Sequence, residues 1–162
     1  MKFDNLDNLM RLRAIMYIAA FTTITLATLG IMTNLYTDYL FPIPGHYYSI
    51  FFGALFFLYL FYRSNLKYSY FAFSEEGNKL VFRYYRMGTI NVKFRSIEIP
   101  KNTLHSWKIK KHFFNKRSEL ILFQSTPKGI AKYPPVPITA LTKQQSDAVM
   151  QTLAMYARKV EN

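Results

Sequence analysis

Residues 14–37 read AIMYIAAFTTITLATLGIMTNLYT, and residues 39–62 read YLFPIPGHYYSIFFGALFFLYLFY. Neither stretch contains Asp, Glu, Lys or Arg, and both are strongly apolar. An α-helix needs about 20 mostly apolar residues to cross the hydrocarbon core of a bilayer. The two stretches therefore predict a transmembrane hairpin over residues 14–62, with helices at 14–37 and about 42–62.

A cleaved signal peptide is the alternative for the first stretch. Its apolar run is too long for the central region of a signal peptide, and no Ala-x-Ala cleavage site follows it. Asp4 and Asp7 also dilute the positive charge ahead of it. We therefore expect a retained helix, followed by a turn in which Pro42, Pro44 and Gly45 reverse the chain.

The orientation of the hairpin follows from its flanking basic residues. Arg11 and Arg13 precede the first apolar stretch, Arg63 and Lys67 follow the second, and the turn between them has no basic residue. Basic residues next to membrane spans favour the cytoplasmic side. Both termini are therefore predicted to be cytoplasmic, with a short head at residues 1–13 and a larger domain at residues 63–162.

The excess positive charge lies entirely in that larger domain. From Arg63 onward the chain has 18 Lys and Arg against 6 Asp and Glu, which accounts for the whole net charge of +12. About 100 residues is an ordinary size for one domain with a single core. The chain contains no cysteine, so no disulfide contributes to this domain.

The domain has the periodicity of short strands. Leu80, Phe82 and Tyr84 alternate with more polar residues after the turn Glu75-Glu-Gly-Asn78. Ile90, Val92 and Phe94 also alternate, and Ile97 and Ile99 continue the pattern one residue out of step, which suggests a bend or a β-bulge near Ser96. Further strands are predicted at 68–73, 104–110, 118–125 and 130–133. The pattern predicts an α+β soluble domain built on a small antiparallel β-sandwich or barrel.

One amphipathic helix is predicted to close the domain. Thr142 and Gln145 have the spacing of a capping box. Val149, Leu153, Tyr156 and Val160 then recur at helical spacing and form an apolar stripe. Trp107, on a predicted strand, is expected in the core, with an interfacial anchor as the alternative.

Strands followed by one C-terminal capping helix resemble the pleckstrin-homology-like (PH-like) fold. Two membrane spans leading into such a domain resemble the bacterial membrane-anchored PH-like family. The matching segments are Glu75–Phe82, Ser96–Pro100, Glu119–Phe123 and Val136–Thr139. The resemblance implies a protein of the bacterial inner membrane that acts by binding, as a scaffold, sensor or accessory subunit. It implies no catalytic residues and no particular ligand.

The segment most suggestive of binding is KIKKHFFNKR at residues 108–117. Basic side chains interleaved with aromatic rings suit an anionic lipid surface or an acidic protein partner. The candidate binding residues are Lys108, Lys110, Lys111, Phe113, Phe114, Lys116 and Arg117. The alternative is a solvated hairpin tip whose phenylalanines fold back onto the core, because charged loops are common.

A second function remains open from the sequence. Membrane hairpins joined to a β-barrel also occur as antiphage effectors that bind a cyclic nucleotide and then damage the membrane. In that case the phosphates would meet Arg83, Arg86, Lys93 and Arg95. Nucleic acid is not expected as a partner, because no helix-turn-helix, zinc-finger or RNA-binding motif is present.

The sequence predicts no enzyme, cofactor or metal site. It has no cysteine nucleophile, no G-x-S-x-G motif, no phosphate-binding glycine loop and no His, Asp or Glu spacing typical of a metal site. In the first span, small residues recur at Ala19, Thr23 and Ala27, with Gly53-Ala54 as a complementary flat site in the second. They predict packing within the hairpin or, alternatively, self-association through the first span.

Overall fold

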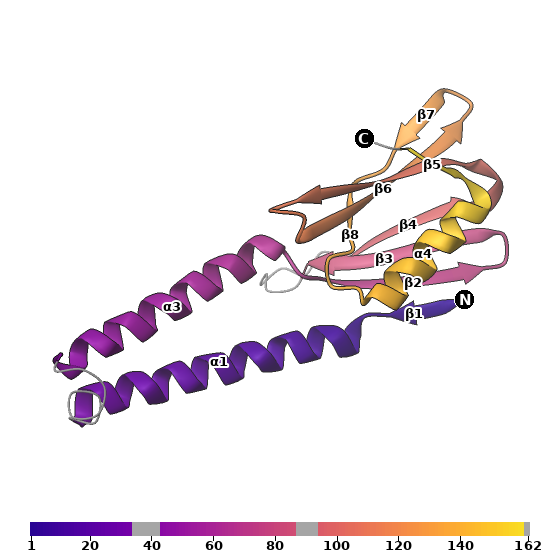
Figure 1. Ribbon diagram of the computed structural model, residues 1–162. Coiled ribbons are helices and arrows are strands. Elements are labelled where there is room, and N and C mark those ends of the chain that lie inside the picture. The colour runs from indigo at the N-terminus through magenta and orange to yellow at the C-terminus, as the bar shows by residue number, and fades with distance from the viewer. Residues whose placement is uncertain (34–42, 87–93, 161–162) are drawn as a thin grey trace. The chain divides into compact units, whose positions relative to one another are not determined.

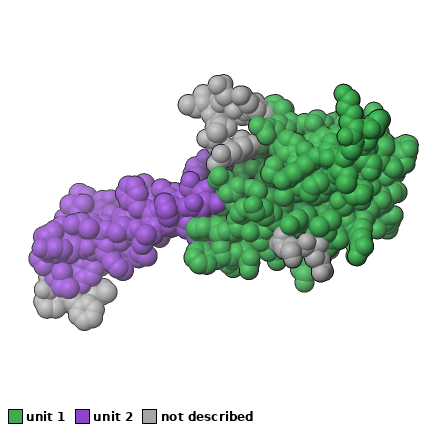
Figure 2. All heavy atoms as spheres, turned by 90° about the horizontal axis from the view of Figure 1, so that it is seen from above, with its two compact units in different colours: residues 1–9, 66–162 green, residues 10–65 purple. Residues whose placement is uncertain are grey.

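A computed structural model of the chain describes residues 1–33, 43–86 and 94–160. The chain divides into two compact units, coloured separately in Figure 2. One unit, here called the sheet domain, consists of Met1–Leu9 and Leu66–Asn162. The other, the helical hairpin, consists of Met10–Asn65. The hairpin is therefore an insertion between two parts of one domain.

Two helices, α1 (Leu6–Met32) and α3 (Gly45–Leu66), are long and apolar enough to cross a membrane. Large apolar side chains such as Phe21, Ile24 and Phe57 are exposed. The chain itself does not cover these surfaces, which is consistent with a membrane protein. Helix α1 begins at Leu6, within the predicted head and before the predicted start of the span at residue 14. The predicted end of the first span and most of the predicted turn fall in residues 34–42, which lie outside the described part.

Small residues let the two helices of the hairpin approach closely. The Ser49 hydroxyl donates to the carbonyl oxygen of Ala27 at 2.7 Å. A Cβ added to Gly45 would lie 2.0 Å from the carbonyl oxygen of Gly30, so this position requires glycine. A Cβ added to Gly53 meets nothing within 4 Å, so the predicted flat site does not make this contact. The self-association prediction remains a prediction.

The first sheet of the sheet domain has the order β1-β2-β3-β4 and is antiparallel throughout (Figure 1). Its strands are β1 (Lys2–Asp4), β2 (Ser69–Glu76), β3 (Lys79–Arg86) and β4 (Arg95–Pro100). Gly77, with φ of 53°, turns the chain from β2 to β3. The register of β3 with β4 is continuous, so the predicted bulge near Ser96 is wrong. The predicted strand residues Ile90 and Val92, ahead of β4, lie outside the described part of the chain.

The second sheet has the order β7-β6-β5-β9, with β8 also paired to β6. Its strands are β5 (Leu104–His112), β6 (Arg117–Thr126), β7 (Gly129–Lys132), β8 (Val136–Pro137) and β9 (Arg158–Lys159). A short 3-10 helix, η1 (Lys101–Thr103), connects the two sheets. All pairings are antiparallel except that of β9 with β5. The register irregularity of this sheet lies between Leu104 and Ser106.

Both sheets and helix α4 (Lys143–Tyr156) contribute to one hydrophobic core. Its side chains include Phe73 and Phe82 from the first sheet, Leu122 from the second, and Leu153 from α4. Trp107 is buried in this core, as predicted, and its indole nitrogen donates to Ala157 O at 3.3 Å. The predicted capping box of Thr142 and Gln145 is confirmed. The helix ends at Tyr156, so Val160 does not belong to its apolar stripe.

The first residues are part of the sheet domain and do not form a separate head. Strand β1 pairs with β2, the backbone N–H of Asn5 donates to Phe71 O, and the Asn5 side chain adds two further bonds to the same strand. Its side-chain amide accepts from Phe71 N at 2.9 Å and donates to Ser69 O at 3.0 Å. The predicted boundary at residue 13 therefore differs from the observed division after Leu9. A three-residue strand leaves almost no periodicity to detect.

Candidate functional site

The tip between β5 and β6 has an unusual backbone. Phe113, Phe114 and Asn115 have φ angles of 50°, 52° and 62°, which are left-handed values. Such a conformation costs an ordinary L-residue roughly 1–2 kcal/mol. The turn is closed by a hydrogen bond from Lys116 N to Phe113 O at 3.0 Å. Local strain of this kind is typical of binding and active sites.

This backbone holds one aromatic ring in solvent. The side chain of Phe114 is 89% exposed, whereas Phe113 is half-buried. The two rings meet edge to face, with centroids 5.7 Å apart. For Phe114, the alternative of a ring folded back onto the core is therefore wrong.

The basic residues of the predicted site do not form one uniform surface. Lys110, Lys111 and Lys116 are exposed. Arg117 instead forms an ion pair with Glu119, whose other carboxylate oxygen lies 3.4 Å from His112 Nε2. Lys108 is half-buried on β5. The free positive charge of the tip therefore comes from three lysines, of which Lys110 and Lys111 lie on opposite faces of their strand.

Beside the tip lies a groove of about 710 Å³. Its walls come from the β5–β6 hairpin, the segment before α4, α4 itself and the last described residues. Lys111, Lys143 and Lys159 line it, together with one acid, Asp147. In the described part of the chain, no ion pair includes any of these three lysines. Lys143 and Lys159 were not among the predicted binding residues, because they lie far from the basic loop in the sequence.

Hydrogen bonds place this groove at the end of the sheet domain from which α1 leaves. The Asn8 side chain donates to Ala140 O at 2.7 Å, and the Gln145 side chain donates to Asp4 O at 2.7 Å. Residues 141–143, between these two contacts, line the groove. Asn5, bonded to Ser69 O, brings the start of β2 to the same place. Figure 1 shows the β5–β6 tip at this end of the sheets.

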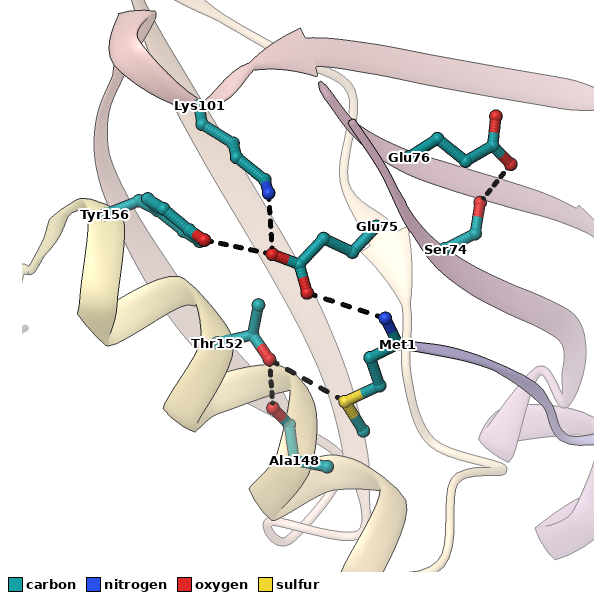
Figure 3. Close-up of polar contacts among 8 residues, drawn as sticks. All are labelled: Met1, Ser74, Glu75, Glu76, Lys101, Ala148, Thr152 and Tyr156. Carbon is teal, nitrogen blue, oxygen red and sulfur yellow. Dashed lines mark hydrogen bonds and ion pairs between the residues drawn. The ribbon is translucent and has the colours of Figure 1, made fainter. Parts of the chain in front are cut away.

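A separate polar cluster of the sheet domain is centred on Glu75 (Figure 3). One Glu75 oxygen accepts from Lys101 Nζ at 2.7 Å and from the Tyr156 hydroxyl at 2.9 Å. The second oxygen lies 3.6 Å from the Met1 nitrogen. The hydrogen bonds from Lys101 and Tyr156 lower the pKa of Glu75, and the bond to Glu75 raises the pKa of Lys101. This cluster connects β1, β2, η1 and α4, so its evident role is structural.

The alternative phosphate-binding residues are not brought together among the residues that the structure describes. Arg83 is opposite Ser96, while Arg95 is opposite the buried Tyr84. Paired residues share a face of a sheet, and the consecutive residues Arg83 and Tyr84 lie on opposite faces. Arg83 and Arg95 therefore lie on opposite faces of the first sheet. Lys93 and the side chain of Arg86 lie outside the described part.

No metal site is apparent within residues 1–33, 43–86 and 94–160, where no three His, Asp or Glu side chains cluster. His112 is held beside Glu119, and His105 is exposed on β5. The absence of enzymatic activity remains a prediction. Comparisons with protein-family models, with curated proteins and with solved structures found no match for this chain.

Proposed function

We propose that this is a two-span bacterial inner-membrane protein whose basic sheet domain binds the anionic surface of its own membrane. The contact is made by the β5–β6 tip, and the protein acts by binding, as a scaffold, sensor or accessory subunit. The observation that carries the proposal is the solvent-exposed ring of Phe114 on a turn that exposed Lys110, Lys111 and Lys116 flank in the sequence. The tip and the neighbouring groove lie at the end of the sheet domain where α1 begins (Figure 1).

The insertion of the hairpin supports a topology with both termini on one side. Strand β1 precedes the hairpin, β2 follows it, and the two strands pair. If α1 and α3 both cross the bilayer, the chain returns to the side from which it left. Arg11, Arg13, Arg63 and Lys67 flank the spans and favour the cytoplasm for that side.

The energetics favour a weak but oriented contact. Each lysine near an anionic leaflet contributes about 1 kcal/mol, and a fully buried phenylalanine side chain contributes about 1.5–3 kcal/mol. Because the domain is already tethered, this energy is not needed for recruitment. It instead holds the domain in one orientation on the membrane.

The PH-like relationship is part of the proposal. Two runs of consecutive antiparallel strands, β2-β3-β4 and β5-β6-β7, and one C-terminal helix support it. Strands β1 and β9 are additions to that plan. A cyclic-nucleotide receptor has less support, because Arg83 and Arg95 do not converge.

The experiment uses the full chain in liposomes. Because the chain has no cysteine, Asn115→Cys provides a single site for a nitroxide label beside Phe114. In phosphatidylcholine containing phosphatidylglycerol, the label should be shielded from a water-soluble nickel relaxant and accessible to oxygen. In phosphatidylcholine alone it should remain in water. Salt near 1 M, where the Debye length is about 3 Å, should also release it.

Two controls accompany this measurement. A label at Ile130→Cys, on exposed β7, should stay in water in both membranes. Adding Phe114→Ser to the Asn115→Cys variant should return its label to water. Equal nickel accessibility at residues 115 and 130 in phosphatidylglycerol would refute the proposal.

A further inference from the structure

We propose that the groove between the β5–β6 hairpin and α4 binds the headgroup of one anionic phospholipid. The inference rests on the proposed membrane location and goes beyond it, because it assigns a stoichiometric site with its own residues. The tip contact is with a surface, whereas the groove is selective for one molecule.

Charge complementarity is the first argument. Lys111, Lys143 and Lys159 come from β5, α4 and β9, and all three line the groove with Asp147. The local balance is therefore positive by two charges. None of these lysines takes part in an ion pair with a described carboxylate, so an added anion displaces no internal partner.

The apolar part of the groove is the second argument. Ile109, Leu141 and Met150 line it together with the lysines. A free phosphate ion or a strongly acidic peptide would gain nothing from these side chains. A phospholipid presents an anionic phosphate and apolar chains in one molecule, so it satisfies both parts of the lining.

Position is the third argument. The segment Leu141–Lys143 is held between Asn8, bonded to Ala140 O, and Gln145, bonded to Asp4 O. Asp4 and Asn8 flank the first residue of α1. If α1 enters the bilayer, this rim of the groove lies within a few residues of the membrane entry point, where lipid headgroups are available.

The test measures lipid retention by the full chain in detergent, where no extended anionic surface exists. Native mass spectrometry should show one phosphatidylglycerol retained in preference to phosphatidylcholine. The triple variant Lys111→Ser, Lys143→Ser, Lys159→Ser should bind short-chain phosphatidylglycerol roughly 100-fold more weakly. That figure corresponds to about 1 kcal/mol for each lysine.

A matched triple variant separates the site from general charge. Lys128→Ser, Lys132→Ser, Arg158→Ser removes the same charge from exposed positions that neither line the groove nor belong to the β5–β6 tip. It should retain the lipid within a few-fold of the wild type. Arg158 is the most stringent comparison, because it is the neighbour of Lys159 on the opposite face of β9. Unchanged melting temperatures would show that both variants are folded.

Several outcomes would overturn the inference. One is that the wild type binds phosphatidylglycerol no better than phosphatidylcholine, and another is that the two triple variants lose the same amount of lipid affinity. The inference would also fail if millimolar inorganic phosphate displaced the lipid, or if a hexaglutamate peptide bound more tightly than the lipid. This test uses the unlabelled chain in detergent, whereas the nitroxide experiment uses labelled variants in liposomes. If the tip enters the membrane but no lipid is retained in detergent, only the groove site is refuted. If a lipid is retained but the tip stays in water, only the tip contact is refuted.

Discussion

At the scale of single residues, Asn5 holds the start of the chain to the sheet through its side-chain amide. The residue is 1% exposed and satisfies one N–H and one C=O of β2. Asn5→Leu keeps a similar volume but leaves both groups buried without these partners. Each unpaired buried group costs about 1–3 kcal/mol, so we expect a loss of about 2–6 kcal/mol.

Denaturant unfolding of the full chain in detergent tests this expectation. Asn102→Leu, at an exposed position in η1, is the control and should change stability little. A loss from Asn5→Leu no larger than that of the control would mean that the first residues do not contribute to the stability of the sheet domain.

The lowered pKa of Glu75 predicts that the stability of the fold depends on pH. Its pKa lies below the ordinary value of 4.5, because Lys101 and Tyr156 donate to its carboxylate. Below that value the unfolded chain takes up a proton before the folded chain does. The stabilisation is therefore complete above pH 4.5 and is lost as the pH falls through the lowered pKa of the folded state.

Glu75→Gln should accordingly flatten the fall of the melting temperature on acidification below about pH 5. The control is Glu98→Gln, since Glu98 and its partner Lys79 are mostly exposed and solvent screens their attraction. It should follow the wild-type profile. Parallel profiles for Glu75→Gln and the wild type would show that the cluster in Figure 3 does not stabilise the fold.

At the scale of elements, α4 is predicted to be a structural part of the core. Leu153 is fully buried among residues of both sheets. Leu153→Ala should therefore cost about 2–5 kcal/mol, measured by chemical denaturation. Met155→Ala, two residues further along and 77% exposed, should be nearly neutral. Equal effects of the two substitutions would exclude α4 from the core.

Elements with several alternating residues could be predicted from the sequence, and the shortest ones could not. Strands β2, β3, β5, β6 and β7 and helix α4 have a clear period, and each was predicted within a few residues. Strands β1 and β9 have three and two residues, and their pairing depends on backbone groups brought together by the fold. The basic tip could be predicted because its residues are contiguous in the sequence. The groove was not, since its three lysines come from separate elements.

At the scale of the whole molecule, the sheet domain requires residues from both sides of the hairpin. A fragment of residues 63–162 lacks β1 and Asn5 and should be less stable than the intact domain. Replacing residues 10–65 with a short Gly/Ser linker should restore that stability, because Asn5 already contacts Ser69. Identical urea midpoints for the fragment and the linked variant would contradict this dependence.

The same connectivity predicts the membrane topology. If α1 and α3 both cross a bilayer, the pairing of β1 with β2 requires the two ends of the hairpin to lie on one side of it, and the proposed function assigns that side to the cytoplasm. In intact cells, a membrane-impermeant maleimide should therefore label Ile43→Cys, just before α3, and should reach Lys128→Cys only after permeabilisation. An alkaline phosphatase fused after Asn162 should be inactive. Labelling of residue 128 in intact cells would show that the topology is the reverse of the predicted one, with the basic tip facing the outer leaflet.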